Sequence, residues 1–263
     1  MIDIHHHCLP GVDDGPRDWD EAVALCRLAA DDGIETIIAT PHVLRGRWQN
    51  ESREALEQLA AELQQRLGDS PRILLGSEYF FAHDIAEVLA SGSGIIPLGA
   101  SRYVLVEFAS HGVPPFVEQP FYRVQLDGWT PVIAHPERNA AFQAKPEMLT
   151  SLVDHGARTQ VTAASLVGDF GPEARQAAFD WIDAGIVHFV ASDAHNTKKR
   201  PPRMTDAFAA VRAAAGEQVA NGLFRDNPRS VMEGRGLAFE PEPRQIEPPR
   251  GLLSRVAKLF KAR

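Results

Sequence analysis

The sequence has little cysteine, no long apolar run and no excess of basic residues. Its 263 residues include two cysteines, Cys8 and Cys26, which are too few for a disulfide framework and fit a reducing cytoplasm. No apolar stretch approaches the ~18 residues that cross a bilayer, and no basic region followed by an apolar one marks a signal peptide. The net charge of −8 argues against broad binding to nucleic acid, although it leaves room for a local basic patch.

Two motifs for handling phosphate are missing as well. Residues 92–94 lack the third glycine of a dinucleotide-binding loop, so no glycine-rich fingerprint supports an open, doubly wound sheet. Neither cysteine begins a Cys-x5-Arg loop, so a thiolate nucleophile of the cysteine-phosphatase type is not indicated.

The chain instead alternates short apolar runs with amphipathic segments. We expect strands at 1–4, 36–39, 73–75, 103–106, 131–134, 159–162 and 186–191. Helical spacing and capping residues predict helices at 19–32, 51–67, 84–90, 117–127, 146–154, 172–184 and 205–215, with a short turn of helix at 227–228. Strands separated by helices favour a parallel sheet in an α/β fold. We therefore expect one domain over residues 1–238, a closed barrel made irregular by its seven strands, with an open doubly wound sheet as the alternative.

Histidine, aspartate or glutamate follows nearly every expected strand. His5 and His7 alternate onto one face of the first strand, and only the sixth strand is followed by no such residue. Because the carboxyl ends of parallel barrel strands converge on one face, we expect these side chains to share one cleft. The candidates are His5, His7, Asp14, His42, Glu78, Glu107, His135, Asp193 and His195.

A cleft of this composition indicates bound metal. Carboxylates close together repel one another, and some become protonated unless cations are present. Mixed histidine and carboxylate donors without cysteine suit Mn²⁺, Zn²⁺ or Fe²⁺. Nine candidate ligands are too many for one ion, so we expect two or three ions and a bridging carboxylate. We interpret the other histidines as structural or surface residues, namely His6, His83, His111, His155 and His188.

Two arginines lie beside these candidates. Arg138 follows His135 closely, and Arg200 ends a Lys-Lys-Arg run after His195. Planar guanidinium groups bind phosphate oxygens in a bidentate manner. Arginines next to metal ligands on an acidic protein favour a phosphate ester as substrate, against the simpler interpretation that both are surface charges.

These motifs resemble those of the polymerase-and-histidinol-phosphatase (PHP) superfamily. The matching segments are His5-x-His7, Thr40-Pro41-His42, Gly76-x-Glu78, Val106-Glu107-Phe108, His135-Pro136-Glu137-Arg138 and Ser192-Asp193-Ala194-His195-Asn196. With Leu9-Pro10-Gly11-Val12-Asp13-Asp14-Gly15, they are most similar to the capsule and exopolysaccharide branch of that superfamily, the manganese-dependent protein-tyrosine phosphatases. The resemblance extends from residue 1 to about residue 235.

The resemblance implies a distorted (β/α)7 TIM-like barrel, the PHP fold, with three divalent metal ions, Mn²⁺ first and Fe²⁺ or Zn²⁺ as alternatives. By motif, the first ion would take His5, His7, Glu78 and Asp193, the second Glu78, Glu107 and His135, and the third Asp14, His42 and His195. Arg138 and Arg200 would be the catalytic residues that bind phosphate. The substrate would be a phosphotyrosine protein, and the partner a membrane-associated tyrosine kinase that controls polysaccharide export.

On this hypothesis a metal-bound hydroxide attacks the phosphorus of phosphotyrosine. Two alternatives stay open. One is hydrolysis of a small phosphomonoester such as histidinol phosphate, and the other is a metal-bound scaffold that binds phosphoproteins without turnover.

The end of the chain, residues 239–263, differs from the rest. Residues 239–250 are rich in proline and glutamate and indicate a loose strap. In 251–263, apolar residues recur at helical spacing between basic ones, Arg255, Lys258, Lys261 and Arg263. We expect either peripheral contact of this cytoplasmic protein with the anionic inner face of the membrane, or a helix packed on the barrel.

Overall fold

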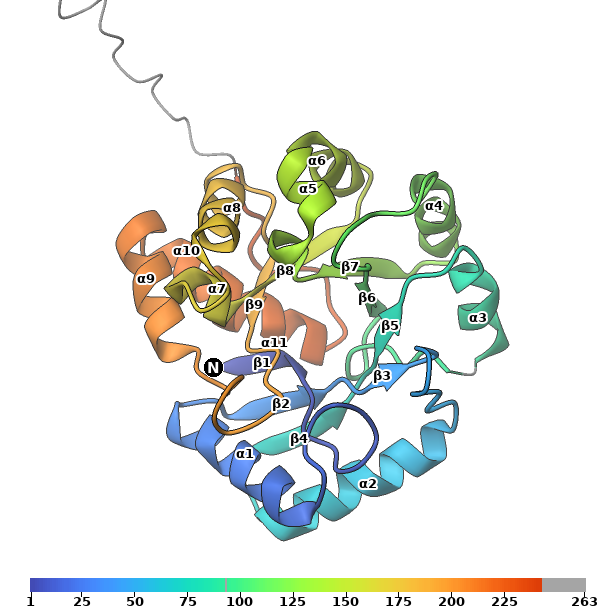
Figure 1. Cartoon of the computed structure of the whole chain (residues 1–263), viewed down its shortest axis with the longest axis vertical. Coiled ribbons are helices and arrows are strands. Elements are labelled where there is room, and N and C mark those ends of the chain that lie inside the picture. The colour runs from blue at the N-terminus through green and yellow to red at the C-terminus, as the bar shows by residue number, and fades with distance from the viewer. Residues whose placement is uncertain (93, 243–263) are drawn as a thin grey trace, which may run out of the picture.

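The strands form a ring that is surrounded by helices (Figure 1). The structure is a computed structural model that describes residues 1–92 and 94–242. Its strands are β1 (Ile2–His6), β2 (Thr36–Ala39), β3 (His42–Val43), β4 (Arg72–Leu75), β5 (Glu78–Phe80), β6 (Tyr103–Glu107), β7 (Thr130–Ala134), β8 (Arg158–Thr162) and β9 (Phe189–Ala191). All pair in parallel, in the orders β1-β2-β4 and β3-β5-β6-β7-β8-β9.

The second and third expected strands, β2 and β4, are each followed by a short strand that the sequence did not predict, β3 and β5. Thr40 and Pro41 separate β2 from β3, and Gly76 and Ser77 separate β4 from β5. Proline has no N–H for the ladder, which accounts for the first break. The two neighbouring chain segments keep their parallel register across both breaks, because the N–H of Glu78 donates to the carbonyl of Pro41 at 3.1 Å. The expected strands are therefore present, and the two additional strands, which begin at His42 and Glu78, belong to the six-stranded sheet.

The ring is closed between its first and last strands. The N–H of Asp193 donates to the carbonyl of His5, and the N–H of His7 donates to the carbonyl of Ala194, both at 2.9 Å. Hydrogen bonds of this kind leave no open edge between β9 and β1. The expected distorted barrel is thereby confirmed, and the alternative of an open doubly wound sheet is wrong.

The long helices lie where the spacing of apolar residues places them. They are α1 (Trp19–Asp31), α2 (Arg53–Leu67), α3 (Ile85–Ser91), α4 (Glu118–Leu126), α6 (Pro146–Asp154), α8 (Pro172–Asp183), α9 (Thr205–Ala215) and α11 (Asn227–Met232). At the start of α1, the Asp18 carboxylate accepts the N–H of Glu21 at 2.9 Å, as its N-cap position predicts. No helix in the described part of the chain is long and apolar enough to cross a bilayer.

Short helical segments and one strand boundary differ from expectation. The sequence did not predict a 3₁₀ turn (Pro136–Arg138), α5 (Ala140–Ala144), α7 (Ala163–Val167), α10 (Glu217–Asn221) or a π-helix (Gly222–Asp226). The last strand begins at Phe189 rather than at residue 186. There the Thr159 hydroxyl donates to the carbonyl of Ile186, so a side chain takes the place of the backbone ladder. Residues 243–263 lie outside the described residues, so the expected strap and amphipathic tail stay predictions.

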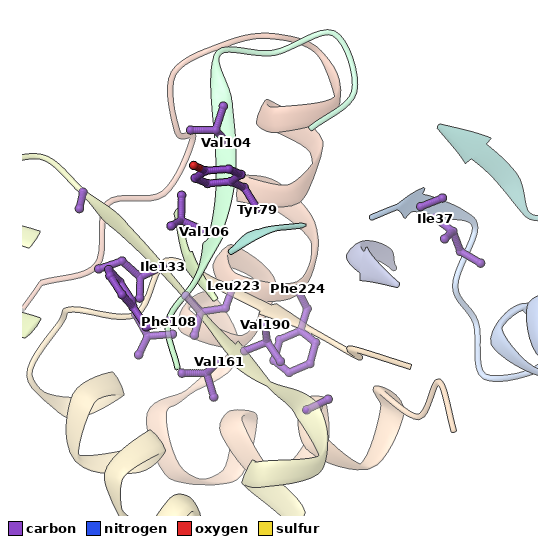
Figure 2. Close-up of a cluster of buried hydrophobic side chains, with 14 of the residues drawn as sticks. Ile37, Tyr79, Val104, Val106, Phe108, Ile133, Val161, Val190, Leu223 and Phe224 are labelled. Carbon is purple, nitrogen blue, oxygen red and sulfur yellow. The ribbon is translucent and has the colours of Figure 1, made fainter. Parts of the chain in front are cut away.

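Two apolar layers hold the barrel together. Val104 and Val106 of β6 join Leu223 and Phe224 of the π-helix in the layer between strands and helices (Figure 2). The alternate residue of β6, Leu105, belongs to a second cluster inside the ring, with members on β1, β2, β7 and β9. This alternation follows from the two-residue period of a strand. It leaves the carboxyl end of the ring to the polar residues that follow the strands.

His188 gives a pH-dependent contribution to stability that can be measured away from the polar end of the barrel. It is buried, its Nδ1 accepts the N–H of Thr159 at 3.2 Å, and burial lowers its pKa to about 3. The folded protein therefore keeps His188 neutral, whereas the unfolded chain protonates it near pH 6.5. Stability from this group is present above pH 6.5 and is lost as the pH falls, by about 2 kcal/mol at pH 5.

We expect urea unfolding of metal-free protein to show this loss between pH 7 and pH 5. His188→Gln keeps an acceptor but cannot titrate, so its free energy of unfolding should fall less over the same interval. An equal fall in both proteins would contradict the assignment.

Candidate metal centre

All nine predicted ligands meet at the carboxyl end of the barrel. They form four overlapping groups in which one nitrogen or oxygen of each residue lies within 4.8 Å of the others. The groups are His5, His7 and Asp193; His5, Glu78 and His135; His42, Glu78 and Glu107; and His7, Asp14, His42 and His195. A cavity of about 270 Å³ opens above them. His5, His7 and His42 each belong to one more group than the motifs implied.

Glu78 lies at the centre of the arrangement. Its carboxylate is buried, with Oε1 2.9 Å from His135 Nε2 and Oε2 3.0 Å from His42 Nδ1. The same two oxygens lie 3.4 Å from the Nε2 atoms of His5 and His7 respectively. Since each oxygen faces a different pair of histidines, this carboxylate lies between neighbouring groups of donors.

His5 and His7 are held with their Nε2 atoms toward the centre. Gln160 Oε1 lies 2.7 Å from His5 Nδ1, and Asp13 Oδ2 lies 2.7 Å from His7 Nδ1. Partners of this kind fix the tautomer and ring orientation of metal-binding histidines. The sequence analysis missed both residues, although Asp13 adjoins Asp14 and Gln160 lies on the expected strand that lacked a ligand.

Asp14, His42 and His195 form the side of the centre nearest solvent. Asp14 Oδ1 lies 3.4 Å from His42 Nε2 and 3.3 Å from His195 Nε2. The Asp14 side chain is 43% exposed, whereas both histidines are buried. Asp14 is therefore the member of this group that is open to solvent.

Both predicted arginines contact the same carboxylate. Arg138 Nη2 donates to Asp193 Oδ2 at 2.6 Å, and Arg200 Nη2 donates to the same oxygen. Both side chains also line the cavity. The structure thus brings two guanidinium groups to the edge of the ligand cluster, where an anion could bind them.

The donors fit divalent cations and not a structural zinc site. Histidine nitrogens and carboxylate oxygens without thiolate are the set that Mn²⁺, Fe²⁺ and catalytic Zn²⁺ accept. Cys8 and Cys26 are fully buried and belong to none of the four groups. The composition, number and overlap of the groups suit a cluster of more than one ion.

The sequence of the whole barrel matches the family model described as capsular polysaccharide synthesis, CpsB/CapC, over residues 1–233. The chain belongs to the CpsB/CapC family. It is 40% identical to the tyrosine-protein phosphatase YwqE of Bacillus subtilis over 92% of this chain and 95% of that protein. It is 33% identical to the tyrosine-protein phosphatase CpsB of Streptococcus pneumoniae over 88% of this chain and 98% of that protein.

Solved structures agree with this assignment. A chain from crystal structures of YwqE and CpsB, described as metal-dependent tyrosine phosphatases, superposes with a TM-score of 0.88. That match is 36% identical and covers 92% of this chain and 99% of the other. A lactonase of Listeria monocytogenes, 14% identical with a TM-score of 0.53, covers 87% of this chain and 91% of the other and shares the fold alone.

Electrostatics in this CpsB/CapC member differ from one ligand to the next. Burial alone would raise the pKa of Glu78, but His5 and His42 outweigh it and hold that pKa well below its ordinary value. Burial and the charge of Glu78 raise the pKa of Glu107 to about 7. Burial lowers the pKa of His135 to about 3, so this residue presents a neutral imidazole at neutral pH. His42 differs from His135, because the charge of Glu78 outweighs burial and raises the pKa of His42 to about 9. Ionised carboxylates and protonated histidines therefore lie side by side, and a divalent cation would take the place of those protons.

The backbone is strained at two of the ligands. His135 has φ 35° and Asp193 has φ 52°, in the left-handed region that side chains with a Cβ seldom adopt. Each residue directly follows a strand or lies within two residues of its end. Strain of this kind persists only where surrounding contacts impose it, and it is common at functional sites. It turns both side chains into the cleft.

Arg45 is a cavity residue that the sequence analysis missed. Its Nη1 lies 2.6 Å from Glu107 Oε2 and 2.9 Å from His42 Nε2. Trp48 of the same loop stacks on His42 with ring centroids 5.2 Å apart. The position of Arg45, close after a predicted ligand, resembles that of Arg138 and could have signalled it.

The remaining histidines lie outside the four groups. His6 is buried on β1 with both ring nitrogens unpartnered in the described structure, and burial lowers its pKa to about 3. His83, His111 and His155 belong to none of the groups, and neither does His188. Their placement agrees with the structural or surface roles that we predicted.

Replacing Glu78 should disrupt metal binding more than replacing any peripheral residue. Because its two oxygens face separate groups, Glu78→Ala removes a shared ligand, and we expect metal affinity to fall by at least about 100-fold. Elemental analysis after dialysis against buffered metal measures this directly. His83→Ala, which alters an exposed histidine outside the groups, is the matched control and should keep its metal. Wild-type metal content in both variants would overturn the central position of Glu78.

Proposed function

We propose that this protein is a metal-dependent protein-tyrosine phosphatase that acts in capsular or exopolysaccharide synthesis. The observation that carries the proposal is the cluster of nine donors with Arg138 and Arg200 on one oxygen of Asp193. Named tyrosine phosphatases among its relatives, aligned over nearly their whole length, support the reaction type. The family description supports the biological context.

We further propose that the cluster holds three divalent ions, with Mn²⁺ as the first candidate and Fe²⁺ or Zn²⁺ as the others. His5, His7, Glu78 and Asp193 would hold one ion, Glu78, Glu107 and His135 a second, and Asp14, His42 and His195 a third. In support, His5, His7 and Asp193 share one group, and Asp14, His42 and His195 share another. Glu107 and His135 lie in two different groups, and both of these contain Glu78. When bound, such ions activate water near neutral pH and neutralise charge on the transferring phosphoryl group.

The arginines supply the phosphate clamp in this proposal. In the free protein Arg138 and Arg200 are held by Asp193, so both guanidinium groups are already in place beside the cleft. A phosphoryl group entering the cavity can accept their remaining N–H groups, which bind its oxygens and keep phosphorus in line for attack. Asp13 and Gln160 keep the histidine rings fixed while this happens. The chain therefore contributes orientation and fixed positive charge.

The physiological substrate in this proposal is a phosphotyrosine protein, namely a membrane-associated bacterial tyrosine kinase. We also propose that the protein works in the cytoplasm and that residues 251–263 contact the anionic inner face of the membrane. The support is the basic, amphipathic composition of that segment, which lies outside the described residues. Co-sedimentation with anionic vesicles, compared with a chain ending at Pro249, tests the contact, and equal binding of both would refute it.

The reaction is tested by resupplying metal-depleted protein with Mn²⁺, Fe²⁺ or Zn²⁺. We expect metal-dependent hydrolysis of a phosphotyrosine peptide, with a higher kcat/KM than for histidinol phosphate. The double variant Cys8→Ser/Cys26→Ser should stay within a few-fold of wild type, because both thiols are buried away from the cavity. Preference for histidinol phosphate would indicate a small-molecule phosphatase, and binding without turnover a scaffold.

The clamp is tested by Arg138→Ala and Arg200→Ala in the same assay. Loss of one charge-assisted contact to the phosphoryl group should lower kcat/KM for phosphotyrosine by about 100-fold in Arg138→Ala, with a similar or smaller loss in Arg200→Ala. Metal content should stay near wild type. Arg72→Ala, at the opposite end of the barrel, is the control. Wild-type kinetics in both clamp variants would mean that another group holds the phosphate.

A further inference from the structure

The mouth of the cavity carries a group of basic side chains, which we call the cationic rim. Arg45, Arg138 and Arg200 line the cavity itself. Arg47, Lys198 and Lys199 are exposed next to Arg45 and Arg200 in the chain. The proposed phosphatase reaction uses Arg138 and Arg200, and it leaves the other four without a role.

The loop after β3 holds its part of the rim firmly. Arg45 and Trp48 exchange backbone hydrogen bonds of 3.0 and 2.8 Å, which closes a tight turn. Asn50 Nδ2 donates to the carbonyls of Val12 and His42, which ties the loop to the metal-binding segments. The guanidinium carbon of Arg47 lies 4.8 Å from the centroid of the Trp48 ring. Its charge therefore stays beside the mouth.

The loop after β9 holds the two lysines in a similar way. The side-chain oxygen of Asn196 accepts the backbone N–H groups of Lys198 and Lys199 at 3.1 and 2.6 Å. It also accepts the N–H of Arg200, and the Arg200 carbonyl accepts the N–H of His195 at 3.0 Å. This turn places both lysines directly beside a residue that lines the cavity.

Some exposed arginines on the helices have carboxylate partners, and the exposed rim cations have none among the described residues. Arg17, Arg53 and Arg66 each pair with a glutamate four residues away on or beside a helix. Within residues 1–92 and 94–242, Arg47, Lys198 and Lys199 form no ion pair. On a chain with a net charge of −8, unpaired cations gathered at one cleft make a local positive field.

We propose that the cationic rim binds acidic residues that flank the phosphotyrosine in the substrate protein. This inference rests on the proposed phosphatase function and specifies its substrate class. The phosphoryl group enters the cavity, and the peptide on either side of it must cross the mouth, where Arg47, Lys198 and Lys199 lie. Carboxylates there meet unpaired cations, which speeds association and lowers KM without altering the chemical step. Basic flanking residues are repelled by the same field.

The test compares three phosphotyrosine peptides of equal length, flanked by glutamate, glutamine or lysine, with p-nitrophenyl phosphate as the substrate that lacks flanks. With Mn²⁺-loaded wild-type protein we expect kcat/KM to fall in the order glutamate, glutamine, lysine, by about 10-fold from first to last at low salt. The preference should shrink at high ionic strength, because the exposed charges are screened.

The decisive variant is Lys198→Ala/Lys199→Ala, with Arg47→Ala as a second. The ratio of kcat/KM for the glutamate peptide to that for p-nitrophenyl phosphate should fall by about 5-fold in the double variant. Arg72→Ala/Arg229→Ala removes the same amount of charge from exposed positions at the other end of the barrel and should keep the wild-type ratio. Circular dichroism and metal content establish that each variant is folded and loaded.

The outcomes distinguish failure of the rim proposal from failure of the proposed phosphatase reaction. If p-nitrophenyl phosphate is hydrolysed but kcat/KM is equal for all three peptides, the rim proposal is wrong and the phosphatase proposal is unaffected. The same conclusion follows if the control variant loses as much of the kcat/KM ratio as the rim variant. If no phosphotyrosine compound is hydrolysed, the phosphatase fails. Fluorescence anisotropy then measures the affinity of the protein for each labelled peptide, and equal affinities for all three would refute the rim proposal. Rim-dependent binding to anionic vesicles without any peptide preference would replace the peptide with a membrane.

Discussion

The structure depends on the compensation of charge buried at one end of the barrel. Glu78 and Asp193 are both buried, and each is surrounded by groups that favour its ionised form. Removing a carboxylate from water is costly unless it is paired, and removing several together is more so. Histidine rings and the Arg138 and Arg200 guanidinium groups carry out this pairing in the protein itself. A divalent cation entering this cleft would take over that pairing from the protons on the histidines.

The barrel is the device that brings these groups together. Pairing between β1 and the segment after β9 sets His5 opposite Asp193, although 188 positions of the sequence separate them. After the breaks at Thr40-Pro41 and Gly76-Ser77, β3 and β5 begin with His42 and Glu78, which pair with each other in the six-stranded sheet. Apolar layers on both sides of the strands fix these ends in place. Figure 2 shows the layer between strands and helices. Rigid strand ends, rather than mobile loops, therefore determine the geometry of the centre.

The strands and the gathering of the candidate ligands could be predicted because nearly every candidate follows an apolar run of recognisable length. His135 after 131–134 and Asp193 after 186–191 are examples. The general rule that parallel barrel strands converge at their carboxyl ends then predicted that these side chains share one cleft. Whether the ring closes could not be read from local patterns, because it depends on hydrogen bonds between the two ends of the chain. The short helix α7 was missed because five residues carry too little periodicity to be recognised. The sequence analysis missed Gln160, Asp13 and Arg45 because each acts through a contact with a candidate ligand, and such a contact is visible only in the folded structure.

Internal pairing of the buried carboxylates bears on the order in which the protein folds and binds metal in a cell. A chain whose acidic centre is already balanced by its own imidazoles and guanidinium groups can complete its fold before any ion arrives. Metal insertion is then a separate, later event, and the finished cavity selects among the ions that the cell supplies. With nitrogen and oxygen donors that several first-row metals accept, availability decides the occupant as much as affinity does. Which metal the protein holds then depends on the metal concentrations in the cell as well as on the sequence.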